Sequence, residues 1–200
     1  MKILGIIPAR FASTRFPGKP LTIINGKTMI QRVYEQSLKA ESLTDVVVAT
    51  DDQRIYDAVI AFGGNVMLTS SEHNSGTDRC CEIVEKIGKQ YDAAVNIQGD
   101  EPFINPEQIN QIASLISTEK SQIASLCKPI KDEDELFDEN VVKVVFDKNY
   151  KALYFSRQTI PFLRKADKDA KTWMEQRTFY KHIGIYAYKV DVLKEIARLP

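Results

Sequence analysis

Three predominantly apolar runs, each followed by a stretch with helical spacing, limit what this chain can fold into. The runs occupy residues 3–7, 46–50 and 93–97. Strands that are apolar at nearly every position are typical of parallel sheets that are covered by helices on both faces. The alternation therefore predicts an α/β fold with a doubly wound, mostly parallel sheet.

Helical spacing and cap residues define the segments between these runs. Apolar residues recur at helical intervals over residues 27–40, and a helix over 54–62 is expected to stop at Gly63-Gly64. We expect Asp51-Asp52 to cap that helix rather than to bind metal. The next helix is predicted over residues 77–91, with Thr77 or Asp78 as its N-cap.

The second half of the chain changes character. Residues 141–146 and 152–155 flank an Asp-Lys-Asn-Tyr stretch, which predicts a hairpin. The segment 164–177 is highly charged and is expected to be a mobile surface segment. A further strand is predicted over residues 181–188 and a helix over 190–199.

Composition excludes several classes of protein. With 27 Lys and Arg against 27 Asp and Glu, the formal net charge is zero, which argues against a protein that wraps nucleic acid. The three cysteines (Cys80, Cys81 and Cys127) match no zinc or redox motif and fit a reducing compartment, and two histidines make a histidine zinc site improbable. No apolar run reaches the length of about 18 residues that a membrane helix needs, so we expect a cytoplasmic protein.

The loop after the first predicted strand carries three cations. Arg10, Arg15 and Lys19 lie within ten residues, among small residues and a glycine, and no Walker or GxGxxG motif is present. In open α/β sheets, ligands bind outside the carboxyl ends of the strands. The loop is therefore predicted to grip polyphosphate. The alternative is a basic surface loop without function.

Two further motifs follow strands or begin helices. Gly99 after the third apolar run would let the backbone approach a ligand, and Asp100 is a candidate Mg²⁺ ligand. Taken alone, residues 98–102 are equally consistent with a metal-binding motif and with a turn whose charged side chains are solvated. Residues 75–79 are either a capped helix start or a set of amides and hydroxyls that recognise a base edge.

Together these motifs resemble a known enzyme family. Residues 8–21, 75–79, 98–102, 154–157 and 182–186 are similar to the 3-deoxy-manno-octulosonate cytidylyltransferases (CMP-Kdo synthetases). The resemblance implies a nucleotide-diphospho-sugar transferase fold and an enzyme that couples CTP to 3-deoxy-D-manno-octulosonate (Kdo), releasing pyrophosphate and CMP-Kdo for lipopolysaccharide synthesis. It also implies Mg²⁺ as cofactor and a homodimer.

The resemblance also assigns site residues in this sequence. Those near the phosphates are Ala9, Arg10, Ser13, Arg15 and Lys19. Those near the cytosine and ribose are Ser75, Gly76, Thr77 and Arg79. Gln98 and Asp100 lie at the α-phosphate, with Asp100 as the metal ligand, and Arg10, Lys19 and Asp100 are the catalytic residues.

The sugar acid would meet Arg157, His182 and Tyr186. A guanidinium suits its carboxylate, and the other two side chains suit its hydroxyls. The alternative is that His182 and Tyr186 are simply polar residues on one face of a strand. A nucleotide-binding part is expected at about residues 1–120, and a sugar-binding and dimerisation part at about 121–200.

The resemblance implies that members of the family extend beyond the part that this sequence matches, by roughly another quarter of their length. A second metal-binding aspartate is expected in that further part. The rival functions are a cytidylyltransferase for another sugar acid, such as an acylneuraminate, and a nucleotide-binding domain without turnover.

Overall fold

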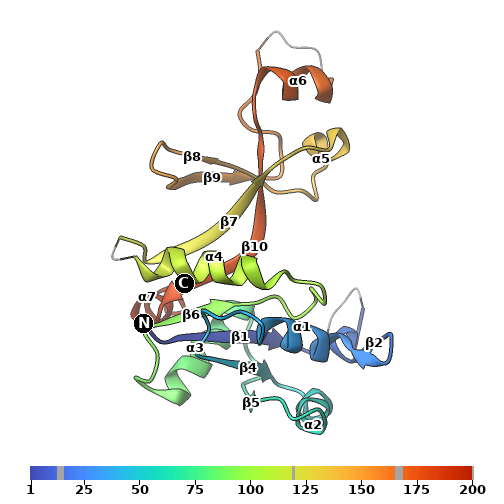
Figure 1. Ribbon diagram of the computed structural model, residues 1–200, viewed down its shortest axis with the longest axis vertical. Coiled ribbons are helices and arrows are strands. Elements are labelled where there is room, and N and C mark those ends of the chain that lie inside the picture. The colour runs from blue at the N-terminus through green and yellow to red at the C-terminus, as the bar shows by residue number, and fades with distance from the viewer. Residues whose placement is uncertain (13–15, 119, 165–168, 200) are drawn as a thin grey trace. The chain divides into compact units, whose positions relative to one another are not determined.

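The computed structural model describes residues 1–12, 16–118, 120–164 and 169–199 (Figure 1). The chain divides into two compact units. Unit 1 consists of Met1–Ala124 and Ile185–Pro200, and unit 2 of Ser125–Gly184. The final segment thus belongs with the unit that contains the predicted nucleotide-binding part. The assignment of nucleotide and sugar to separate parts of the chain stays a prediction.

Unit 1 is built on a sheet with the strand order β5-β4-β1-β6-β10. The first four strands are parallel, and β10 runs antiparallel to β6. The fold is thus α/β with a mostly parallel sheet, as predicted. The strands are β1 (Ile3–Ala9), β4 (Asp45–Thr50), β5 (Val66–Leu68), β6 (Ala93–Asn96) and β10 (Tyr180–Lys189), with a small hairpin of β2 (Ile23–Ile24) and β3 (Lys27–Thr28).

Helices connect these strands and cover the sheet (Figure 1). They are η1 (Lys19–Leu21), α1 (Met29–Ser37), α2 (Gln53–Ala61), α3 (Gly76–Ile87), α4 (Pro106–Ser117) and α7 (Val190–Ile196). Side chains alternate along a strand, so Leu4 and Ile6 point to the same face. Both belong to a buried cluster with Ile83 of α3 and Leu193 of α7. The buried strand core predicted from the apolar runs is therefore confirmed.

The helix boundaries follow local cap chemistry. Asp52 caps α2, accepting a hydrogen bond from the Arg54 N–H at 2.9 Å, as expected. Gly63 follows that helix at φ 77°, a left-handed conformation that suits a helix stop. The cap predicted for α3 is wrong. Ser75 is the N-cap, because its hydroxyl and the Asp78 carboxylate each accept a backbone N–H in a capping box.

Unit 2 contains the predicted hairpin. Its elements are α5 (Glu133–Phe137), β8 (Lys143–Phe146), β9 (Ala152–Ser156), α6 (Ala170–Gln176), the first part of β10 and the end of β7 (Ile123–Pro129). The prediction of a charged surface segment over 164–177 is wrong for α6. Trp173 of that helix is 1% exposed and packs against Phe179 and Leu136. Ala170 and Met174 pack against the same cluster, so α6 is held by its apolar side chains while Lys171 and Glu175 stay exposed.

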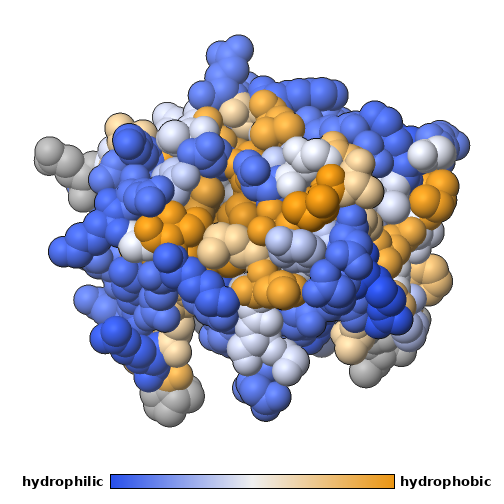
Figure 2. All heavy atoms as spheres, turned by 90° about the horizontal axis from the view of Figure 1, so that it is seen from below, coloured by the Kyte–Doolittle hydropathy of each residue, from blue (hydrophilic) through white to orange (hydrophobic). Residues whose placement is uncertain are grey.

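One face of the molecule carries hydrophobic residues that gather among hydrophilic ones (Figure 2). In unit 1 a shallow groove at the edge strand β5 is lined by residues including Ile60, Val66, Met67 and Tyr91. The described helices include none that is long and apolar enough to cross a membrane.

Candidate active site

A cavity of about 670 Å³ lies in unit 1. It is reached by the carboxyl ends of β1 and β6, which are neighbours in the sheet. The next strand of this sheet along the chain, β4, lies on the opposite side of β1. The strand order therefore reverses between β1 and β6, and such a switch point is where open α/β sheets bind ligands. The lining residues are Pro8, Ala9, Arg10, Phe16, Lys19, Pro20, His73, Asn74, Ser75, Gly76, Thr77, Arg79, Asn96, Gln98, Gly99, Asp100 and Tyr186.

The loop after β1 brings two of the predicted cations to the cavity. Arg10 and Lys19 both line it, whereas Ser13 and Arg15 lie outside the described residues. The ends of the loop are joined, because the Gly18 N–H donates to the Phe11 carbonyl at 2.9 Å. Gly18 has φ 72°, which favours glycine. The Phe11 ring in turn lies under the Arg54 guanidinium, 3.3 Å from ring centroid to Cζ.

Asp100 lies opposite this loop. Its carboxylate accepts a hydrogen bond from Lys19 Nζ at 2.6 Å, and the two side chains are 50% and 38% exposed. Half-exposed charges at a cavity wall are accessible to a ligand, and such an ion pair contributes little to stability. Gly99 explains how the two strand ends approach so closely. A Cβ at Gly99 would lie 2.7 Å from the Pro8 carbonyl oxygen.

The N-terminus of α3 forms another wall. Ser75, Gly76 and Thr77 all line the cavity, and their contact with cytosine and ribose stays a prediction. The first N–H groups of a helix lack partners within it and carry partial positive charge, so they attract phosphate and carbonyl oxygens. Gly76 packs against Pro8, where an added Cβ would meet the ring at 3.4 Å.

Arg79 lines the cavity but is buried, with 3% exposure. Its guanidinium donates to the Asp51 carboxylate at 2.8 Å and to the Thr69 hydroxyl. The expectation that Asp51 serves as a helix cap is therefore wrong, since only Asp52 does so. Arg79 joins the ends of β4 and β5 to α3. Its contact with cytosine or ribose stays a prediction.

Asn96 is a cavity residue that sequence reasoning missed. It ends β6, is 4% exposed and pairs in register with Tyr186 of β10. Among the described residues, its Oδ1 is the buried side-chain polar atom without a hydrogen-bond partner. A buried acceptor without a donor is costly, and a ligand donor would satisfy it. The signal was available, because asparagine is unusual in a strand that is otherwise apolar.

Five other cavity residues were not assigned individually: Pro8, Phe16 and Pro20, which lie within the predicted motif at 8–21, and His73 and Asn74. His73 and Asn74 directly precede the predicted motif at 75–79. Their position next to that motif was the signal that could have identified them.

The predicted sugar-acid residues fall in different units. Tyr186 lines the cavity of unit 1, and burial raises the pKa of its hydroxyl. In unit 2, Arg157 follows β9, is exposed, and donates to the Glu139 carbonyl at 2.9 Å. His182 bonds the Ser125 hydroxyl at 2.7 Å and lies edge-on to the Phe155 ring. Burial lowers the pKa of His182, so its ring is neutral at pH 7.

Comparison with known proteins gives one consistent result. The cytidylyltransferase family model matches residues 4–199. The 3-deoxy-manno-octulosonate cytidylyltransferase of Parabacteroides distasonis is 57% identical over 204 residues, which cover 100% of this chain and 80% of the relative. An 8-amino-3,8-dideoxy-manno-octulosonate cytidylyltransferase of Shewanella piezotolerans is 48% identical with the same coverage.

A solved structure agrees with these sequence relatives. The structure of a CMP:2-keto-3-deoxy-manno-octonic acid synthetase complexed with CTP has a TM-score of 0.90 and 42% identity to this chain. The match covers 100% of this chain and 79% of the other.

Proposed function

The chain belongs to the cytidylyltransferase family, and we propose that it transfers the cytidylyl group of CTP to Kdo, giving CMP-Kdo and pyrophosphate. The observation that carries the proposal is the cavity at the β1–β6 switch point. There Arg10, Lys19 and Asp100 line one cavity beside the N-terminus of α3, and Lys19 pairs with Asp100. Cations, amides and one carboxylate are the groups that a metal–triphosphate complex requires.

The chemistry is an in-line displacement at phosphorus. The anomeric hydroxyl oxygen of Kdo attacks the α-phosphorus of CTP, and its proton passes to solvent. The bond from that phosphorus to the bridging oxygen breaks, and pyrophosphate leaves with the bonding electrons. Catalysis of this kind is mainly positioning and electrostatic stabilisation. Arg10 and Lys19 neutralise the charge that builds up on pyrophosphate, and the amides of α3 orient the nucleotide.

We propose Mg²⁺ as cofactor, held by Asp100. The residues fit this ion, because Mg²⁺ binds one or two carboxylates together with phosphate oxygens and water. Within the described residues, no three His, Cys, Asp or Glu side chains gather into a cluster that could hold a metal ion without substrate. When bound, Mg²⁺ supplies positive charge to the phosphate oxygens. Asp100 would then exchange its bond with Lys19 for one to the metal, which frees Lys19 for phosphate.

For the sugar acid, we propose the predicted set of Arg157, His182 and Tyr186. A guanidinium can bind a carboxylate through two parallel hydrogen bonds. A neutral His182 and a protonated Tyr186 can each donate to or accept from sugar hydroxyls. The relative from Shewanella piezotolerans makes the 8-amino sugar a specific second candidate substrate.

We also propose a homodimer that forms through unit 2. Leu153 and Tyr154 of β9 are each 64% exposed and Phe155 is 43% exposed. Leu153 and Phe155 point to one face of β9 and Tyr154 to the other. Exposed apolar side chains of this kind are typical of a surface that a partner covers. Light scattering should give twice the chain mass, and a charged substitution at Leu153 should reduce it. A cytoplasmic role in lipopolysaccharide synthesis completes the proposal, since CMP-Kdo is the activated form in which Kdo is used there.

The test is product formation by purified protein. With CTP, Mg²⁺ and Kdo, pyrophosphate and CMP-Kdo should appear in equal amounts, and neither should appear without Kdo. Parallel reactions with the 8-amino sugar and with an acylneuraminate rank the acceptors by kcat/KM. CTP binding without pyrophosphate release from CTP, whichever acceptor is added, would instead support a nucleotide-binding domain without turnover.

A further inference from the structure

The cavity wall at residues 73–75 is held by carboxylates on α3. We propose that Glu82 is a positioning residue that fixes His73 and the segment 68–75 for nucleotide binding. The proposal rests on the proposed function, since the nucleotide is taken to be CTP. Glu82 does not line the cavity itself, so it would act through residues that do.

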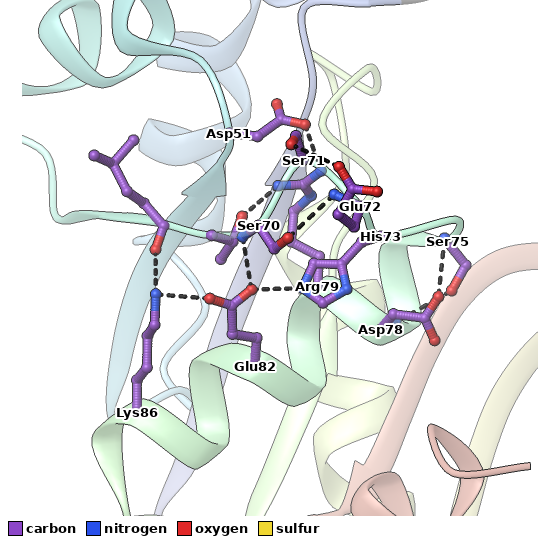
Figure 3. Close-up of polar contacts among 12 residues, drawn as sticks. Asp51, Ser70, Ser71, Glu72, His73, Ser75, Asp78, Arg79, Glu82 and Lys86 are labelled. Carbon is purple, nitrogen blue, oxygen red and sulfur yellow. Dashed lines mark hydrogen bonds and ion pairs between the residues drawn. The ribbon is translucent and has the colours of Figure 1, made fainter.

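Glu82 makes three bonds to three different groups. Its Oε2 accepts the Ser70 N–H at 2.8 Å and contacts His73 Nε2 at 2.5 Å. Its Oε1 accepts from Lys86 Nζ at 2.7 Å, and that ammonium also donates to the Leu68 carbonyl at 2.7 Å. Figure 3 shows Glu82 between Lys86 and His73, with Ser70 above it. The carboxylate thus binds the segment directly at Ser70 and His73, and through Lys86 at Leu68.

The spacing along α3 explains why one helix can do this. Asp78, Glu82 and Lys86 are four residues apart, so their side chains lie in a row on one face. Asp78 holds the Ser75 N–H at 3.0 Å, directly beyond the Glu82 contact with His73. Arg79 adds its bond to Thr69 (Figure 3). The segment that forms the wall therefore takes its shape from α3.

The Glu82 carboxylate is suited to hold these contacts at every physiological pH. Its side chain is 20% exposed. Burial raises its pKa, but the hydrogen bonds from Lys86, Ser70 and His73 outweigh this and lower the pKa to about 2. The carboxylate is therefore ionised over the whole physiological range. A change to glutamine keeps the shape but replaces one acceptor oxygen by an amide that cannot accept from Lys86 or His73.

The first experiment compares Glu82→Gln with Glu85→Gln in steady-state kinetics. Glu85 is an exposed residue of the same helix, so Glu85→Gln controls for lost charge on α3. Glu82→Gln should raise KM for CTP about 10-fold and leave kcat and KM for Kdo little changed. The reason is that the wall binds the nucleotide equally in the ground state and in the transition state. Glu85→Gln should match the wild type. Equal KM for CTP in all three proteins would overturn the proposal.

The second experiment does not depend on turnover. The chain has two histidines, His73 and His182, so ring ¹⁵N signals can be assigned with a His182→Asn variant. Glu82→Gln should shift the His73 ring signals and leave those of His182 in place. CTP affinity by calorimetry should fall in parallel. Unchanged His73 signals in a folded Glu82→Gln protein would refute the positioning role, whatever the acceptor sugar proves to be.

A double-mutant cycle separates positioning from loss of fold. If Glu82 acts through His73, the effects of Glu82→Gln and His73→Asn on CTP affinity should be strongly non-additive. Full additivity would contradict the proposal. Wild-type protein that binds CTP but makes no CMP-Kdo would count against the proposed function alone.

Discussion

Gly99 is the position where one added methyl group should separate folding from catalysis. It follows β6 between Gln98 and Asp100, and all three residues line the cavity. An alanine Cβ there would lie 2.7 Å from the backbone carbonyl oxygen of Pro8, at the end of β1. A backbone atom cannot rotate away as a side chain can, so the two strand ends must move apart.

The required movement sets the size of the effect. Ordinary contact of a Cβ begins at 3.4 Å, which leaves a shortfall of 0.7 Å. Displacing Asp100 from the cations of the first loop by that distance disturbs a site that depends on positioning, where about 1 Å can cost about 100-fold in rate. Gly99→Ala should lower kcat/KM for CTP about 10- to 100-fold, or about 1.4–2.7 kcal/mol of transition-state stabilisation.

Gly5→Ala provides the matched control. Its Cβ would also be close to a neighbour, 2.8 Å from Leu43 Cδ1, but that atom is the end of a flexible side chain. Gly5 lies in β1 and is not among the cavity residues. Pyrophosphate release should therefore stay near wild type in Gly5→Ala, even where its melting temperature falls. A folded Gly99→Ala with wild-type kcat/KM would refute the reasoning from strand-end spacing.

Three other substitutions test separate parts of the site. Asp100→Asn should reduce turnover at saturating Mg²⁺ by about 100-fold or more. It should change the free energy of unfolding by less than about 1 kcal/mol, because the ion pair of Asp100 with Lys19 is half exposed. Near-wild-type turnover would rule out Asp100 as the metal ligand. Arg157→Lys should raise KM for Kdo about 10-fold and spare CTP binding, since a lysine loses the two-pronged contact; equal loss of CTP affinity would assign Arg157 to the nucleotide. Glu82 has a pKa of about 2 in the folded protein against an ordinary value of 4.5. A carboxylate whose pKa is lowered by folding stabilises the protein fully at pH values above its unfolded-state pKa. This stabilisation is lost as the pH falls toward its folded-state pKa. Glu82→Gln should thus cost about 1–3 kcal/mol in urea unfolding at pH 7, with the difference from wild type shrinking between pH 4.5 and 2; a pH-independent difference would contradict the assignment.

The amino-acid sequence by itself determined the sheet and the general position of the site. The apolar runs at 3–7, 46–50 and 93–97 have one stable arrangement, because strands apolar on both faces must be covered by helices on both. Once those strands are parallel, whatever follows them meets at one edge. That is why Arg10, Lys19 and Asp100 could be brought together from sequence order alone.

Only the tertiary structure decided which partners these and other side chains have. Asp51 looked like one of two equivalent cap residues, yet it pairs with Arg79, which is 28 positions away. The charged segment around Trp173 looked like free surface, but the indole is buried in a cluster with Ile130, Leu136 and Phe179. Glu82 carried no motif at all, and Asn96 stood out only as an asparagine in an otherwise apolar strand. Burial and hydrogen bonding between distant segments depend on the packed arrangement of the whole unit, and local sequence patterns report only neighbours along the chain.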